Sequence, residues 1–167
     1  LCCALTACGN TTPTNNDGNG SGSSGQVQSG NAVANKDYFE WSQIPGHENE
    51  ITGYTTEGLK QTELVIPENC TSVQGLKENS TVKHVVFANP ETEIHANTFR
   101  DCTNLESVEL PANLTILDDS VFNGCTKLKT ISIPDRVVEL GSNVFLGCEG
   151  LETVEFGSCL LYTSPSP

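Results

Sequence analysis

The sequence predicts a solenoid, in which short and mostly parallel β-strands from successive repeats stack side by side. Residues of the same kind recur at a period of 23 along residues 99–156. Each repeat also contains a short stretch that alternates apolar and polar residues, which is typical of a half-buried strand. One such strand cannot bury its apolar face alone, so the repeats must stack. We expect irregular or short helical return segments between the strands.

Three copies of the repeat are regular enough to define columns of equivalent residues. The phenylalanine column is Phe99, Phe122 and Phe145, the cysteine column is Cys102, Cys125 and Cys148, and the leucine column is Leu105, Leu128 and Leu151. We expect these nine residues to form the structural core. Two degenerate copies precede them: one places Leu76 and Asn79 in the phenylalanine and cysteine columns, and an earlier one ends at residues 64–67. The array therefore has about five rungs within residues 61–160.

The strand of each repeat has two faces. In residues 105–110, Val108 and Leu110 point to one side, whereas Ser107 and Glu109 point to the other. A period of about 20 to 29 residues with this Leu-x-x-Val-x-Leu pattern is typical of leucine-rich repeats. The outward strand positions are the predicted ligand-facing residues: His84, Val86, Ser107, Glu109, Thr130, Ser132, Thr153 and Glu155. They are mostly small and polar, without the aromatic or arginine anchors of tight interfaces.

The cysteine column is predicted to fill space in the core. Stacked rungs bring equivalent Cα atoms to about 5 Å, within reach of a disulfide. However, three cysteines in one column cannot all pair with one another, and Asn79 occupies the same column one repeat earlier. A zinc site would need four convergent ligands, and no histidine falls near the column. Cys70 and Cys159 fall outside the cysteine column, and the repeat pattern assigns them no role.

The segment "VFNGCTKLKTISIPDRVVELGSNVF" at residues 121–145 resembles the BspA-like (Treponema pallidum type) leucine-rich repeat proteins. Their consensus runs through a phenylalanine, a cysteine, "L..V.IP" and a "V..IG...F" return. The resemblance covers about residues 50–156, and "ITGYTTEGLKQTELVIPENC" looks like the leading segment of such arrays. Leu76, Asn79 and Ala88 depart from the pattern. The resemblance implies a surface protein associated with adhesion to host matrix, epithelial surfaces or other bacteria.

Residues 1–36 predict export and lipid attachment. Leu5-Thr6-Ala7-Cys8 resembles a bacterial lipobox, so residues 1–7 would be the remnant of a signal peptide and Cys8 the lipidated residue; an ordinary signal peptide or a chance apolar start are the alternatives. Residues 8–36 are rich in Gly, Ser and Asn and predict a flexible linker of roughly 30 Å reach. We expect an exported, membrane-anchored lipoprotein at the cell surface.

Both ends of the array differ from its middle. Residues 37–60 predict an N-terminal capping β-hairpin and a leading segment, because an uncovered first rung would expose apolar area and a strand edge. Phe39, Trp41 and Tyr54 would cover that rung, with sugar binding by exposed aromatics as the alternative. Residues 161–167 match no column and read as a non-repeat tail, with a non-native origin as an alternative.

Composition limits the functions that remain. The chain carries 21 acidic and 8 basic residues, a formal net charge of −13 that would repel phosphate backbones, so we expect no nucleic-acid partner. No apolar run approaches the ~20 residues that span a bilayer. No catalytic or metal-binding motif occurs, so we predict a binding protein without enzymatic activity, cofactor or metal. The expected partner is a protein of a host matrix or microbial surface. A passive spacer and the non-catalytic part of a surface hydrolase are alternatives.

Overall fold

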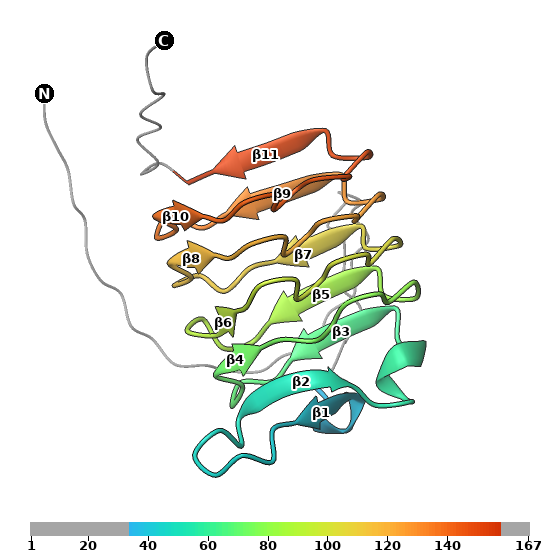
Figure 1. The fold of residues 1–167 in the computed structure, drawn as a ribbon, viewed down its shortest axis with the longest axis vertical. Coiled ribbons are helices and arrows are strands. Elements are labelled where there is room, and N and C mark those ends of the chain that lie inside the picture. Colours follow the sequence, from blue (N-terminus) through green and yellow to red (C-terminus); the bar gives the residue numbers. More distant parts are fainter. Residues whose placement is uncertain (1–33, 158–167) are drawn as a thin grey trace, which may run out of the picture. The chain divides into compact units, whose positions relative to one another are not determined.

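The computed structural model describes residues 34–157, and in this part the chain winds into a stack of β-strand rungs (Figure 1). Each rung contributes one strand to each of two walls. The long-strand wall consists of β3 (Glu63–Ile66), β5 (His84–Phe87), β7 (Ser107–Glu109), β9 (Thr130–Ile133) and β11 (Thr153–Phe156). The short-strand wall consists of β2 (Glu50–Tyr54), β4 (Ser72–Val73), β6 (Glu93–Ile94), β8 (Ile116–Leu117) and β10 (Glu139–Leu140). The predicted leucine-rich repeat solenoid is confirmed.

The first rung carries the predicted β-hairpin. A short 3-10 helix, η1 (Lys36–Tyr38), leads into β1 (Phe39–Trp41), which pairs antiparallel with β2. A second 3-10 helix, η2 (Gly58–Lys60), follows before β3. Phe39 is buried, and Trp41 and Tyr54 pack against the core. The aromatic side chains of the hairpin therefore cover the end of the stack, as a cap requires.

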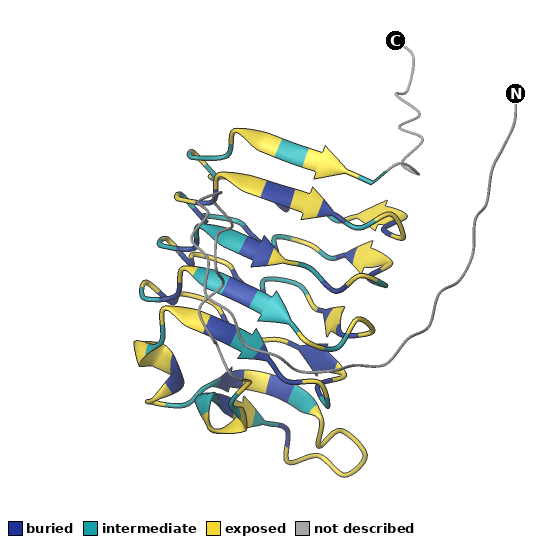
Figure 2. Ribbon diagram, turned by 180° about the vertical axis from the view of Figure 1, so that it is seen from behind, coloured by how far each residue is buried: buried dark blue, intermediate teal, exposed yellow. Residues whose placement is uncertain are grey.

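The long strands pair in parallel and in register, which determines which side chains line up. β3 and β5 pair over four residues, β5 and β7 over three, and β9 and β11 over four. Val85, Val108 and Ile131 are buried, whereas their outward neighbours remain at least partly exposed, as the alternating colours of Figure 2 show. β7 (Ser107–Glu109) is shorter than the strand predicted over residues 105–110. Leu105 is buried in the bend that precedes β7, and Pro111 lacks the N–H that would extend the strand.

A corner segment joins the two walls in each rung and contains the phenylalanine column. Phe99 and Phe122 are fully buried, with ring centroids 5.7 Å apart and planes 3° from parallel. Phe122 and Phe145 repeat this stacking at 6.0 Å. The backbone N–H groups of Phe99 and Phe122 donate to the carbonyls of Val121 and Val144 in the next rung, both at 3.0 Å. Packing and hydrogen bonding therefore join successive corners.

The corner bends sharply because two positions in each rung adopt left-handed backbone conformations. These positions are Asn97, Ser120 and Asn143 in one column and Asp101, Gly124 and Gly147 in the other. Glycine, asparagine and aspartate tolerate a positive φ better than other residues. At Gly124 (φ 77°), an added Cβ atom would meet the carboxyl group of Asp101, so that side chain would have to move.

Asn79 replaces cysteine in the irregular rung for a local reason. Its side chain is 2% exposed, and its Oδ1 accepts hydrogen bonds from the backbone N–H groups of Thr81 (2.7 Å) and Val82 (3.0 Å). A thiol cannot accept two such bonds as well as a carbonyl oxygen. Leu76, in the phenylalanine column of this rung, is fully buried.

Both walls are interrupted between the same two rungs. No strand pairing joins β6 to β8 or β7 to β9 within residues 34–157. At the end of the long strands, Ala88 N–H donates to Ile66 O and Gly157 N–H to Ile133 O, but the equivalent Pro134 has no N–H for the β7–β9 joint. On the short-strand wall, the sequence spacing between aligned residues of neighbouring rungs also changes here. It is 21 residues before the interruption (Val73 to Ile94) and 23 residues after it (Leu117 to Leu140). The corner ladder continues through this joint, with backbone hydrogen bonds from Asn97, Phe99 and Asp101 to the next rung.

Candidate functional site

The predicted ligand-facing residues lie on the outward face of the long-strand wall, where strand register aligns them. His84 is opposite Ser107 and Val86 is opposite Glu109. On the last two strands, Thr130 is opposite Thr153 and Ser132 opposite Glu155. Five are exposed: Glu109, Thr130, Ser132, Thr153 and Glu155. His84, Val86 and Ser107 are half-buried, and His84 Nδ1 lies 2.7 Å from Ser107 Oγ.

The structure adds a strand that the sequence reasoning left out of this face. β3 pairs with β5 so that Glu63 is opposite His84 and Val65 is opposite Val86. Glu63 is exposed and Val65 is half-buried. The alternation of outward residues with the buried Leu64 and Ile66 could have revealed this strand. However, this copy of the repeat is shifted by two residues relative to the later copies. The outward face therefore spans five strands.

The electrostatics of this face are mild. Lys83 Nζ lies 3.3 Å from Glu106 Oε1 at the strand entrance, and this ammonium group lowers the pKa of the Glu106 carboxyl through a hydrogen bond and Coulomb attraction. Glu63, Glu109 and Glu155 place carboxylates on the outward face. Hydroxyl, imidazole and carboxylate groups here can exchange hydrogen bonds with a partner. The surface therefore offers polar contacts to a partner.

The cysteine column lies at the corner, and its thiols form a ladder of hydrogen bonds. The thiol of Cys102 donates to the carbonyl of Leu76 (3.2 Å), and Cys125 donates to that of Phe99 (3.2 Å). Cys148 repeats the contact with Phe122 at 3.0 Å. Burial raises the pKa of Cys102 to about 12, so its thiol stays protonated and is a poor nucleophile. Each thiol therefore satisfies a carbonyl of the preceding rung.

The remaining core and cysteine residues differ in how deeply they are buried. Leu105 and Leu128 are fully buried, whereas Phe145, Cys148 and Leu151 in the last described rung are partly buried against the core. Cys70 is a buried free thiol that donates to Ser72 O, and burial raises its pKa to about 11. Cys8, the predicted lipidation residue, and Cys159 lie outside the described residues.

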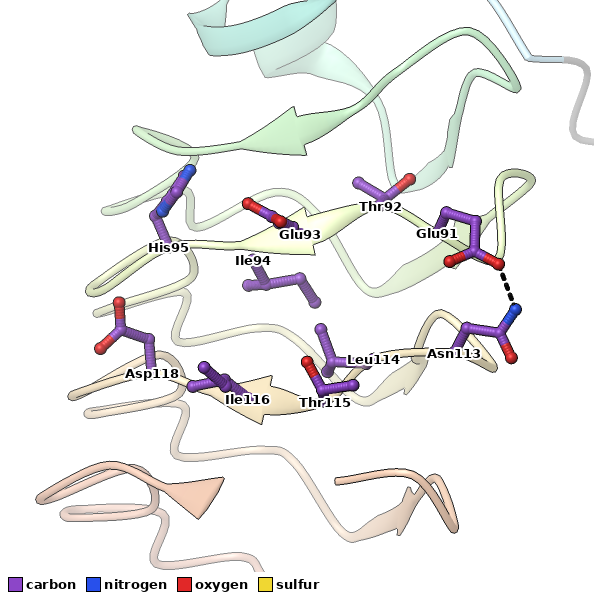
Figure 3. A pocket seen from close by; sticks show the side chains of 10 residues that line it. All are labelled: Glu91, Thr92, Glu93, Ile94, His95, Asn113, Leu114, Thr115, Ile116 and Asp118. Carbon is purple, nitrogen blue, oxygen red and sulfur yellow. Dashed lines mark hydrogen bonds between the residues drawn. The ribbon is translucent and has the colours of Figure 1, made fainter. Parts of the chain in front are cut away.

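A cleft that the sequence reasoning did not find lies on the short-strand wall, between β6 and β8 (Figure 3). Its volume is about 350 Å³, and residues 91–95, 113–116 and Asp118 line it. Ile94 and Leu114 form an apolar floor, and Glu91, Glu93 and Asp118 supply carboxylates. No sequence column marks this site, because it arises where the two rungs fail to pair. Two shallower clefts lie beside the N-terminal hairpin.

Within residues 34–157, no three His, Cys, Asp or Glu side chains lie close enough together to hold a metal ion. The same part of the chain contains no helix with the length and apolar character needed to cross a bilayer.

The family follows from this repeat together with a sequence match. The model of the BspA type leucine rich repeat region matches residues 75–164 in six copies, which is more than half of the chain. The chain belongs to the BspA-type leucine-rich repeat family. No curated protein matches it.

Two crystal structures share the fold of this BspA-type chain. The pneumococcal vaccine antigen PcpA is 22% identical, with a TM-score of 0.62 over 77% of this chain and 30% of that one. A leucine-rich cell surface protein from Faecalibacterium prausnitzii is 19% identical, with a TM-score of 0.52 over 59% of this chain and 33% of that one. The chain therefore spans about a third of the length of each.

Proposed function

We propose that this BspA-type chain is the binding module of a bacterial cell-surface lipoprotein that adheres to proteins of a host or microbial surface. The observation that carries this proposal is the outward face of the long-strand wall, where strand register aligns the outward side chains of β3, β5 and β7 and, separately, the small polar and acidic ones of β9 and β11. The similarity to the F. prausnitzii protein, which is described as a cell surface protein, supports the location.

The chemistry of this face suggests how a partner would bind. Ser107, Thr130 and Thr153 are short, so a partner's larger side chains can approach the strands closely. Their hydroxyls both donate and accept hydrogen bonds. Because aromatic and arginine anchors are absent from the aligned outward positions, the partner would supply them, and the affinity of this wall alone would be modest.

Adhesion can be tested with the full chain on immobilised matrix proteins. The triple variant Ser107→Arg, Thr130→Arg and Thr153→Arg places three long cations on the wall and should abolish most of the retention. A matched control changes Ser80, Thr103 and Ser142 to arginine, since these residues are exposed and their side chains make no hydrogen bond within the described residues. Equal retention of the wild type and the wall variant would remove the proposed patch.

The lipid anchor is a separate part of this proposal. Cys8 follows small residues, as lipid attachment requires, and residues 8–36 would tether the repeats to the membrane. In cells fed a labelled fatty acid, the wild-type protein should incorporate label and sediment with membranes. Cys8→Ser should lose both properties. Label retained in Cys8→Ser would contradict lipidation at this residue.

A passive spacer, or the non-catalytic part of a larger surface hydrolase, is the second candidate. The lack of aromatic or arginine anchors at the aligned positions favours it, as does the fact that the chain spans only about a third of similar structures. A spacer predicts that the repeats retain no matrix protein or microbial surface, with or without the arginine substitutions.

A further inference from the structure

The cleft between β6 and β8 is bounded at both ends by contacts between the two rungs. At one end, Asn113 donates to Pro90 O through its backbone N–H and to Glu91 through its side chain (Figure 3). At the other end, the Ala96 N–H donates to Asp118 Oδ2 at 3.1 Å. Between these contacts no strand pairing joins β6 to β8, whereas β8 pairs normally with β10. The opening is therefore a feature of this joint.

The lining of the cleft combines apolar and acidic surface. Ile94 and Leu114 are buried and point toward one another across the floor, and Ile116 at the rim is 46% exposed (Figure 3). Glu91, Glu93 and Asp118 supply carboxylates, and the lining contains no lysine or arginine among the described residues. Outside the cleft, Glu139 lies opposite Ile116 in the strand register and is exposed, so it extends the acidic rim by one rung.

This combination selects a particular class of occupant. Lysine side chains lay their aliphatic stems along apolar surface while the ammonium group stays near water, where a carboxylate can pair with it. A volume of about 350 Å³ lies at the lower end of ligand pockets, so it admits one or two side chains of a larger partner. Acidic side chains would be repelled by the rim and by the net charge of −13.

We propose that the cleft between β6 and β8 is a docking site for lysine side chains presented by an extended basic segment of a partner protein. One lysine stem lies over Ile94 and Ile116, and its ammonium group pairs with Glu93 or Asp118. The cleft is on the short-strand wall, so this site is separate from the ligand-facing residues of the long-strand wall. It does not depend on adhesion through that wall.

The test is an NMR titration of the isotopically labelled full chain at low salt with a ten-residue peptide of alternating lysine and alanine. Saturable shifts should concentrate in residues 91–96 and 113–118, and a peptide of alternating glutamate and alanine should cause none. The double variant Glu91→Gln and Glu93→Gln should weaken binding about fivefold, because it removes two of the three carboxylates that line the cleft. Glutamine at position 91 still offers an oxygen to Asn113, so the fold is retained.

The matched control is Glu149→Gln with Glu152→Gln, which removes the same net charge from two exposed residues that do not line the cleft. Their loss should weaken binding less than about twofold, because screening limits distant charges. A further variant, Ile116→Ser, should also weaken binding without changing the charge. Equal weakening by both charge variants, shifts spread over both walls, or the absence of saturable binding would each overturn the proposal.

Discussion

The corner and the walls respond differently at the joint between the β6–β7 rung and the β8–β9 rung. At the corner, Phe99 and Asp101 donate backbone hydrogen bonds to the next rung at 3.0 and 2.7 Å. On both walls, the strands of these two rungs do not pair with each other. The comparison shows that the corner, with its stacked phenylalanines, keeps its backbone hydrogen bonds across a joint where the wall strands do not pair. The walls are then free to vary, and one of them opens into a cleft.

The largest expected effect comes from emptying the corner. Phe122 is fully buried between Phe99 and Phe145, so Phe122→Ala should cost about 3–5 kcal/mol of unfolding free energy through lost burial and an unfilled cavity. Chemical denaturation of the purified chain would measure it. Phe156→Ala on the wall is the matched control, since Phe156 is 51% exposed and its loss should cost less than about 1 kcal/mol. Similar losses of unfolding free energy for the two variants would show that the corner contributes no more to stability than the wall.

The next effect concerns the backbone of the corner. Gly124→Ala should destabilise the chain by about 1–2 kcal/mol, because it forces a left-handed alanine and places a Cβ atom against Asp101. Gly46→Ala is the control: Gly46 has φ +87°, but nothing lies within 4 Å of its added Cβ. The denaturation midpoint should therefore fall further for Gly124→Ala. If Gly46→Ala proved as costly, close packing of the corner would not contribute.

The thiol ladder should contribute less. Cys125→Ala removes a fully buried sulfur and its hydrogen bond to Phe99 O, with an expected cost of about 1 kcal/mol. Cys148→Ala makes the same change in a rung that is only partly buried, so it should cost less. Thermal unfolding of both variants compares them directly. A larger loss for Cys148→Ala would argue against burial as the source of the effect.

The smallest effect is expected on the wall. Pro134→Ala supplies an N–H at the position where Ala88 and Gly157 donate to the preceding strand. The added bond and the lost rigidity of proline oppose one another, so the unfolding free energy should change by less than about 1 kcal/mol. The equivalent change Pro111→Ala, at the β5–β7 joint, serves as the control. A cost above about 2 kcal/mol for Pro134→Ala would show that the wall at this joint is rigidly held.

The sequence predicted the corner well because the corner depends on side-chain identity. A buried ring or thiol must recur at each rung to fill the same space, so Phe122 and Cys125 are visible as columns. The hairpin cap followed from the exposed strand edge that it covers. Two columns of left-handed residues, which include Asn97 and Gly124, carried a readable signal in their asparagine, aspartate and glycine content.

The interruption of the walls could not be predicted in the same way. Pro111 and Pro134 occupy the same column, yet β5 and β7 pair over three residues and β7 and β9 do not pair. Pairing across a joint depends on the relative position of two backbones, which no single column of residues reveals. The cleft follows from that separation. By contrast, the alternation of apolar and polar residues was enough to identify the outward residues from His84 to Glu155. Glu63 was missed because its repeat copy is shifted by two residues relative to the later copies.

Amide hydrogen exchange across the joint tests most directly whether the corner stays hydrogen-bonded where the wall strands do not pair. Phe99 donates across this joint at the corner, and Ser107 donates to the preceding rung on the paired part of the wall. Thr130 is equivalent to Ser107 but faces the unpaired joint. The amide of Thr130 should exchange at least about tenfold faster than those of Ser107 and Phe99. Equal protection of Thr130 and Ser107 would show a continuous wall and contradict this account.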